Sequence, residues 1–86
     1  MLRDADLERR LKSAAAQFSE ILDVHEFIIK LVRGRLYVSC HCTLSDDLSL
    51  ARVHDIQTEL EIYFKQDAPE LFRVLIHPEP TTDNRR

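Results

Sequence analysis

Residues 24–44, which read VHEFIIKLVRGRLYVSCHCTL, decide the fold of this chain. Residues 24–32 are rich in β-branched and aromatic side chains, and residues 36–44 alternate in polarity; both patterns are typical of β-strands. Gly34, the only glycine of the protein, lies between them, where a tight turn needs a residue that tolerates a positive φ. The stretch therefore predicts a β-hairpin that turns at Gly34.

The sequence on either side of the hairpin predicts two helices and a third strand. Behind a capping Asp4 or Asp6, apolar side chains recur every three or four positions, at Leu7, Leu11, Ala14, Ala15, Phe18, Ile21 and Leu22. Ser49 caps a second helix that runs to about residue 65, with an inner face of Leu50, Val53, Ile56, Leu60 and Phe64. A last strand follows at about residues 72–77 and ends at Pro78 and Pro80, which lack backbone donors.

This order of elements predicts an α+β fold of the form α-β-β-α-β. Two helices would cover one face of a three-stranded sheet, making a small two-layer sandwich. The last strand reaches the sheet through a helix, so it can lie parallel to one strand of the hairpin. A chain of 86 residues has room for one modest core. We therefore expect a single domain over residues 1–86, with a frayed tail at 81–86.

Composition and charge exclude several functions. The net charge is -3 and no stretch collects Lys and Arg, whereas nucleic-acid-binding proteins are usually basic. The longest uncharged apolar runs, such as residues 27–29, are far shorter than the roughly 20 residues that span a bilayer. Charged residues directly after Met1 and Leu2 leave no signal-peptide core. We therefore expect a cytoplasmic protein that binds no nucleic acid and does not insert into a membrane.

The four histidines, His25, His41, His54 and His77, lie on four different predicted elements. A hairpin centred on Gly34 places His25 opposite Thr43 and diagonally next to His41, although a slip of one residue would separate them.

His77 and Glu79 lie two residues apart in extended chain, so both side chains leave on the same side. Imidazole nitrogen and carboxylate oxygen suit Zn²⁺, and also Mn²⁺, Fe²⁺, Co²⁺ or Cd²⁺. Taken singly, histidines are more often surface or hydrogen-bonded residues than ligands. Spacing alone therefore leaves two interpretations, a shared metal site or histidines that bind no metal.

Cys40 and Cys42 flank His41, but strand alternation sends both thiols to the opposite face, with Val38 and Leu44. This predicts that they are small buried hydrophobic residues; the alternative is a soft-metal site at a bulge. Two cysteines at this spacing on one strand seldom reach disulfide geometry.

Catalytic motifs are absent from the sequence. There is no Gly-rich phosphate loop, no nucleophile beside a base in a known motif, and no pair of carboxylates in a plausible cleft. Asp46 and Asp47 are typical of a turn and a helix entry. The sequence therefore predicts that the protein is not an enzyme.

Five blocks occur together in one order: VHEF at 24–27, the turn at 33–34, VSCH at 38–41, DLSLARVH at 47–54 and VLIHPEP at 74–80. Together they resemble the C-terminal cytosolic domain of the cation diffusion facilitator family, over about residues 22–80. That family has a V-H-D-L-like start, a turn glycine, an H-L-like second strand, a D-x-x-L-S-L-x-x-A-H-like helix entry and a closing I-H-x-E-P.

The resemblance implies a metallochaperone-like fold, a variant of the ferredoxin-like fold, that dimerises and holds metal at and near the dimer interface. It places His25, His41, His54 and His77 at positions that supply metal ligands in the family, and Glu79 at the position of a bridging carboxylate. It also implies a homodimeric, zinc-binding regulatory domain that couples the cytosolic metal level to a membrane cation transporter.

The family usually follows six membrane spans, which this sequence lacks. The chain is therefore interpreted either as an excised domain or as a free-standing protein built on the same domain. A cytosolic metal buffer or metallochaperone-like protein, and a purely structural dimerisation module, are the two alternatives to the regulatory function.

Overall fold

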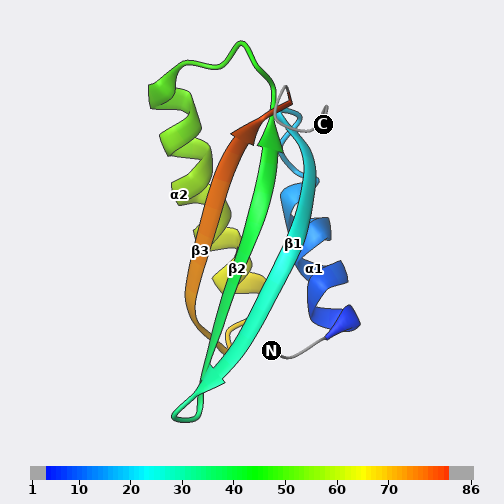
Figure 1. Cartoon of the computed structure of the whole chain (residues 1–86), viewed down its shortest axis with the longest axis vertical. Coiled ribbons are helices and arrows are strands. Elements are labelled where there is room, and N and C mark those ends of the chain that lie inside the picture. Colours follow the sequence, from blue (N-terminus) through cyan, green and yellow to red (C-terminus); the bar gives the residue numbers. More distant parts are fainter. Residues whose placement is uncertain (1–3, 82–86) are drawn as a thin grey trace.

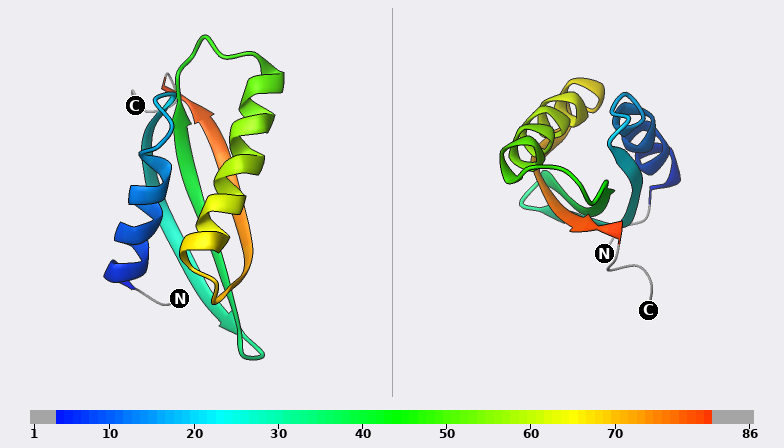
Figure 2. Two further views of the ribbon diagram at one scale, coloured as in Figure 1. Left: turned by 180° about the vertical axis from the view of Figure 1, so that it is seen from behind. Right: turned by 90° about the horizontal axis from the view of Figure 1, so that it is seen from above.

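The computed structural model describes residues 4–81 and confirms the predicted order of elements (Figure 1). The elements are α1 (Ala5–Ala15), β1 (Ile21–Val32), β2 (Arg35–Leu44), α2 (Leu50–Asp67) and β3 (Leu71–Pro80). The strands form one sheet in the order β1-β2-β3, with β1 and β2 antiparallel and β2 and β3 parallel. Both helices lie on the same face of the sheet (Figure 2). The predicted two-layer α+β fold is confirmed.

The core lies between this sheet and the two helices. The helices contribute Leu7 and Leu11 from α1 and Phe64 from α2, each at most 1% exposed. The central strand β2 contributes Cys40 and Cys42, which are fully buried. Since the helices cover only one face, the opposite face of the sheet carries the polar side chains of the strands and is called the outer face below.

The first helix is shorter than the apolar spacing predicts. Asp4 caps it by accepting a hydrogen bond from the backbone N–H of Leu7, as predicted, but the helix ends at Ala15. Phe18 follows the helix in a turn, where its ring packs against that of Tyr63 with centroids 5.5 Å apart. Its burial therefore extends the apolar pattern of the helix beyond the helix itself. Residues 21 and 22 then belong to β1, which begins three residues earlier than predicted.

The second helix begins where the sequence predicts, since the Ser49 hydroxyl accepts a hydrogen bond from the backbone N–H of Arg52. It runs to Asp67, two residues further than predicted. Leu50 does not belong to its inner face, because it is 86% exposed at the first helical position. Packing against the core starts only at Val53.

The third strand continues through both prolines to Pro80, so the prediction that it ends near residue 77 is wrong. β3 is an edge strand, and an edge strand tolerates proline because its backbone donors on one side have no partner strand. The extension matters for function because it keeps His77 and Glu79 on one extended segment in register with β2.

The hairpin turn is confirmed at Gly34. Val32 pairs with Arg35, so the turn consists of Arg33 and Gly34 alone, with φ values of 52° and 76°. Positive φ at both positions is the geometry of a type I′ turn, which matches the twist of the two strands.

Within residues 4–81, neither helix is both long enough and apolar enough to cross a membrane. Residues 1–3 and 82–86 lie outside the described residues, so most of the predicted frayed tail remains a prediction. The prediction that the frayed tail begins at Thr81 is wrong, because the backbone N–H of Thr81 donates a hydrogen bond to the Asp46 carboxylate at 2.8 Å.

Candidate metal centre

Two imidazoles and a carboxylate converge on the outer face of the sheet. His25 of β1, His41 of β2 and Glu79 of β3 each bring one potential ligand atom to within 4.8 Å of the other two. Glu79 lies between the rings: its Oε1 is 2.9 Å from Nε2 of His25, and its Oε2 is 3.0 Å from Nδ1 of His41. The three adjacent strands therefore supply one side chain each.

Strand register explains the position of Glu79. In the parallel pair, His41 is opposite His77 and Thr43 is opposite Glu79. Alternate residues of a strand share a face, so all four belong to the outer face. This confirms the prediction that His77 and Glu79 leave the chain on the same side.

A β-bulge determines the partner of His25. Ile28 pairs with Ser39 and His25 pairs with His41, so β1 has one more residue than β2 between these pairs. Glu26 lies in this bulge with a φ of 53°. The sequence predicted that His25 would face Thr43; it faces His41 instead, because the turn has two residues and the bulge absorbs one more.

The bulge also selects the face on which His25 lies. Phe27 and Ile29 are buried toward the helices, so a regular strand would send residue 25 to the same side. The extra residue reverses the alternation, so that Val24 is buried and His25 reaches the outer face.

Glu79 is held in its charged form. Its side chain is 17% exposed, and the hydrogen bond with His41 lowers its pKa below the usual value. Burial opposes this shift, while the charge of His25 and a hydrogen bond donated by the Thr43 hydroxyl at 3.3 Å reinforce it. A charged carboxylate between two imidazoles is a suitable ligand for a divalent cation.

Two further carboxylates lie against the outer nitrogens of the rings. Asp23 Oδ2 is 3.0 Å from Nδ1 of His25, and Glu26 Oε2 is 3.4 Å from Nε2 of His41. The Asp23 contact does not have hydrogen-bond geometry, so Nδ1 of His25 is a buried atom without a hydrogen-bond partner among the described residues. Because Nε2 of His25 faces Glu79, a metal ion at the cluster would bind Nε2 and leave the proton on Nδ1 directed toward Asp23.

Sequence reasoning missed both of these carboxylates. Asp23 could have been found, because it precedes His25 by two residues on the same strand and so shares its face. Glu26 could not, since it reaches His41 only through the bulge, for which the sequence gives no turn or glycine signal.

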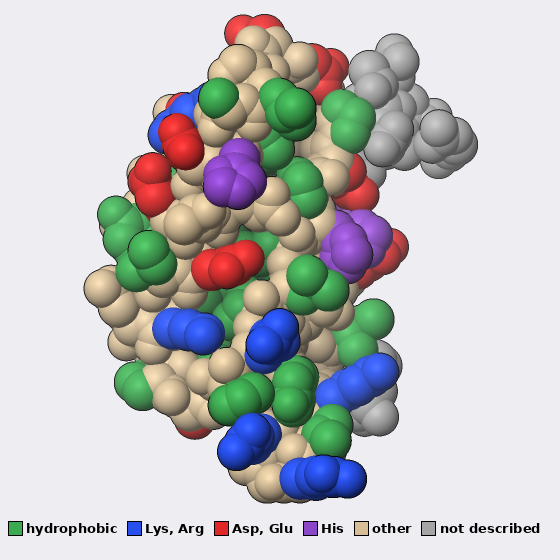
Figure 3. Space-filling view, turned by 90° about the vertical axis from the view of Figure 1, so that its left-hand side faces the viewer, with side chains coloured by type: hydrophobic (Ala, Val, Ile, Leu, Met, Phe, Trp, Pro, Cys, Tyr) green, Lys and Arg blue, Asp and Glu red, His purple; other side chains and the backbone are tan. Residues whose placement is uncertain are grey.

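The other two predicted histidines lie outside this group of three. The ring of His77 is adjacent, with its centroid 5.3 Å from that of His41. His54 lies in the first turns of α2 with an exposed side chain and is not among the clustered ligand atoms of residues 4–81. In the space-filling view, histidine side chains accordingly show at two separate places in the upper half of the molecule (Figure 3).

The cysteines face the core, as predicted. Cys40 and Cys42 are both free thiols with no exposed surface. Burial raises the pKa of each to about 12. Because a thiol must lose its proton to bind metal, the alternative of a soft-metal site at these two residues is disfavoured.

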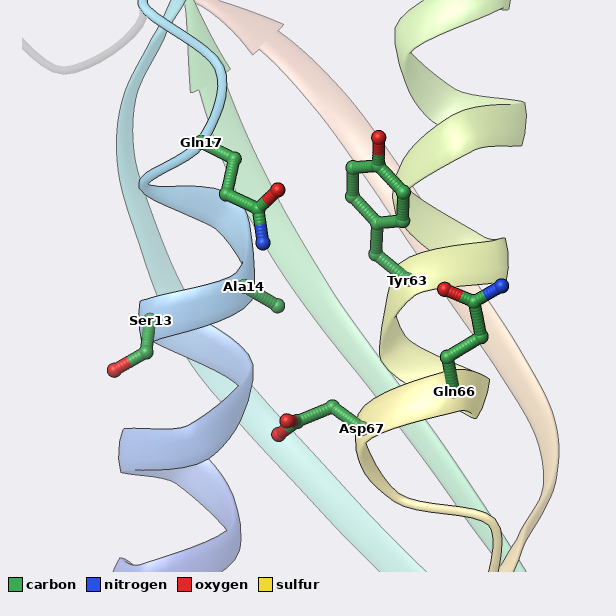
Figure 4. A pocket seen from close by; sticks show the side chains of 6 residues that line it. All are labelled: Ser13, Ala14, Gln17, Tyr63, Gln66 and Asp67. Carbon is green, nitrogen blue, oxygen red and sulfur yellow. The ribbon is translucent and has the colours of Figure 1, made fainter.

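A separate hollow of about 350 Å³ lies between the two helices (Figure 4). Its lining contains no histidine or cysteine and a single carboxylate, so it does not provide a metal site. The lining residues are Ser13, Ala14, Gln17, Tyr63, Gln66 and Asp67.

Comparison with known proteins agrees with the fold. The family described as "Cation efflux protein, cytoplasmic domain" matches residues 3–81. No curated protein matches the chain.

Solved structures share the fold at low sequence identity. The metal-bound C-terminal domain of the CzcD transporter from Thermotoga maritima is 17% identical, with a TM-score of 0.82 over 93% of this chain and 94% of that one. A cytosolic domain of a cation diffusion facilitator family protein is also 17% identical, with a TM-score of 0.82 over 90% and 92%. A variant of the MamM C-terminal domain in a cadmium form is 10% identical, with a TM-score of 0.79 over 88% and 95%.

At these identities, the solved structures establish the fold, while the family match establishes kinship. As the five sequence blocks predicted, the chain belongs to the family of cation efflux protein cytoplasmic domains, which is not a family of enzymes.

Proposed function

We propose that this domain binds a divalent metal ion, Zn²⁺ in the first instance, through His25, His41 and Glu79, and thereby regulates cation efflux. The observation that carries the proposal is the convergence of these three side chains from three strands, with their ligand atoms within 4.8 Å of one another. Two nitrogens and a carboxylate oxygen are a donor set that Zn²⁺, Mn²⁺, Fe²⁺, Co²⁺ and Cd²⁺ accept.

The charge around the rings favours a cation. Glu79 lies between the imidazoles, and the carboxylates of Asp23 and Glu26 lie 3.0 and 3.4 Å from their other nitrogens. Neutral imidazoles surrounded by three carboxylates give the site a net negative charge, which a divalent ion offsets. Since imidazole binds metal only in its neutral form, binding weakens as the pH falls and protons compete for the ring nitrogens.

His77 and His54 extend the proposed ligand set. His77 lies beside His41 and can reach a metal ion on the exposed side of the cluster. His54 lies apart from the cluster on its own chain, so in this proposal it binds metal only when a second copy brings it alongside.

The proposed regulatory step is a change in how two copies associate. The outer face carries Ile28 at 41% and Leu75 at 53% exposure beside the cluster, together with a hollow of about 250 Å³ that both residues line. Metal that bridges groups on two copies would favour a more closed dimer. The family description places such domains in the cytoplasm, where the proposed partner is a membrane cation transporter.

Calorimetric titration of Zn²⁺ into the full chain near neutral pH, paired with thermal melting, tests this function. We expect binding heat and a higher melting temperature, and loss of both in His25→Ala with His41→Ala. Glu61→Ala, which removes a carboxylate from α2 outside the cluster, is the matched control and should bind as the parent does. Absence of heat above dilution together with an unchanged melting temperature would contradict metal binding.

The alternative of a purely structural dimerisation module makes a different prediction. It requires that His77→Ala with Glu79→Ala leaves both metal affinity and dimer shape unchanged. The proposed function predicts that this double variant loses affinity and no longer changes shape when Zn²⁺ is added. Small-angle scattering with and without Zn²⁺ separates the two.

A further inference from the structure

Basic side chains gather at the end of the sheet farthest from the metal centre. There the β1–β2 hairpin extends past the helices (Figures 1 and 2). On the face shown in Figure 3, Lys and Arg side chains predominate toward this lower end, whereas the visible histidine side chains lie in the upper half. The basic tip, as it is called below, comprises Lys30, Leu31, Val32, Arg33, Arg35 and Arg73, all of them exposed.

The cations of the basic tip are not neutralised by any carboxylate of residues 4–81. Within residues 4–81, the ion pairs of arginine involve Arg9, Arg10 and Arg52, and no carboxylate lies within ion-pair distance of a cation of the basic tip. Register places Lys30, Tyr37 and Arg73 side by side across the three strands. The sequence shows no basic stripe because Arg73 joins the others only through this pairing.

Aromatic contacts hold part of this surface in place. The guanidinium of Arg35 lies 4.4 Å from the centroid of the Phe72 ring, an attractive cation–π geometry. Phe72 in turn meets Tyr37 edge to face, with centroids 5.5 Å apart. Arg35 is therefore positioned without losing its charge to a carboxylate.

Aliphatic side chains lie among these cations. Leu31 is 60% exposed and Val32 is 45% exposed, next to the turn formed by Arg33 and Gly34. A projecting turn with aliphatic side chains bordered by Lys and Arg has the chemistry of a membrane-surface contact, in which cations meet anionic headgroups and short apolar side chains enter the interfacial layer.

We propose that the basic tip docks this domain on an anionic lipid surface. A nucleic acid would use the cations but not the exposed Leu31 and Val32, so lipid accounts for more of the surface. The net charge of -3 does not oppose docking, because the molecule is 39 Å long and charges are screened beyond about 8 Å at physiological salt.

This inference does not depend on the metal-binding proposal. His25 and Val32 lie seven residues apart on β1, which corresponds to roughly 23 Å along a strand. Failure of one proposal therefore leaves the other standing, and each can be tested in variants that preserve the other site.

Co-sedimentation of the full chain with vesicles tests the docking. We expect binding to phosphatidylcholine vesicles that contain phosphatidylserine, weaker binding at high salt, and no binding to vesicles of phosphatidylcholine alone. Each basic residue near an anionic surface contributes a factor of about five, so Arg33→Glu, which removes one positive charge and adds a negative one, should lower partitioning about 25-fold. Leu31→Ser with Val32→Ser should also lower it, at unchanged net charge.

Lys12→Glu is the matched control, because it changes the net charge equally on α1 and should lower partitioning far less than Arg33→Glu. Thermal melting establishes that each variant is folded. Equal losses in Arg33→Glu and Lys12→Glu, equal binding to neutral and anionic vesicles, or binding to duplex DNA but not to vesicles would each overturn the proposal.

Discussion

Glu79 is the residue on which the candidate centre depends, because its two carboxylate oxygens contact both imidazoles. Its lowered pKa keeps it charged, with the hydrogen bond to His41 as the main cause. His25 and His41 gain their orientation from the same carboxylate. The site thus consists of ligands that already hold one another in place, which reduces the ordering that metal binding requires.

Removing only the charge of Glu79 should therefore be enough to impair binding. Glu79→Gln keeps the shape of the side chain but lowers its attraction for a divalent cation. We expect at least about a tenfold loss of Zn²⁺ affinity, since loss of even an outer-shell partner of a metal costs about this much. Calorimetric titration measures the loss. Glu61→Gln is the control, and equal affinities in both variants would argue against Glu79 as a ligand.

The two cysteines should be chemically inert in the folded protein. Cys40 and Cys42 are fully buried, and burial raises the pKa of each to about 12. A thiol reagent at neutral pH should therefore label them only as fast as the protein unfolds, and at once in urea. Rapid labelling of native protein would contradict their assignment to the core.

Ionisation of the same two thiols should lower the free energy of unfolding at alkaline pH. Because their folded pKa values lie above the unfolded value near 9, their contribution to the free energy of unfolding is complete below about pH 9 and is lost as the pH rises toward 12. Urea unfolding at increasing pH measures this. Replacement of Cys42 by Ala should flatten the decline, whereas an unchanged slope would count against the burial of this thiol.

Among the elements, β1 departs most from a regular strand, and its bulge is what places the first ligand. Glu26 adopts a φ of 53°, which costs a non-glycine residue roughly 1–2 kcal/mol. Bulges of this kind are often found beside functional sites, where they redirect a side chain. Here the redirected side chain is His25.

Deleting Glu26 should preserve the site. Removal of the extra residue makes the ladder regular while His25 stays opposite His41, so Zn²⁺ affinity should equal that of Glu26→Ala, which loses the same carboxylate but keeps the bulge. Parallel titrations of the two variants make the comparison. If the deletion abolishes binding and Glu26→Ala does not, the register described for β1 is wrong.

The hairpin turn should depend on glycine at position 34. Gly34 has a φ of 76° and open space around the position of a Cβ atom, so Gly34→Ala should lower the free energy of unfolding through backbone strain alone, by about 1–2 kcal/mol. Gly34→Asn should cost less, because Asn tolerates this conformation. Urea unfolding checks the order, and an equal cost for both would speak against a left-handed turn residue.

These elements show what the sequence can and cannot determine. Capping at Asp4 and Ser49, the turn at Gly34 and the buried thiols depend on local chemistry, and all were predicted. The pairing of His25 with His41 depends on a bulge that competes with regular alternation, so it was not. The early end of α1 was also missed, because Phe18 preserves helical spacing from within a turn.

At the scale of the whole molecule, the two ends of the sheet differ in chemistry. One end carries the imidazoles and carboxylates of the candidate metal centre, and the other carries the basic tip. Between them the outer face exposes Ile28 and Leu75, which no described helix covers. The candidate ligands at the first end were predicted from the resemblance to cation diffusion facilitators. The basic tip was not predicted, because Lys30 and Arg73 come together only when both of their strands pair at Tyr37.

Association of two copies should depend on metal. We expect sedimentation and small-angle scattering to show a dimer that becomes more compact when Zn²⁺ is added, because bridging ions favour the closed arrangement. His54→Ala should leave the affinity of the single-chain cluster nearly unchanged but reduce the compaction, since His54 lies apart from the cluster. Identical scattering with and without Zn²⁺ would contradict this regulatory step.

The most direct test of the central claim is anomalous diffraction at the zinc absorption edge from crystals grown with Zn²⁺. We expect an anomalous peak at bonding distance from His25, His41 and Glu79, and its disappearance in crystals of His25→Ala with His41→Ala. A peak only at surface carboxylates or at His54, with Glu79 still in contact with both imidazoles, would contradict it.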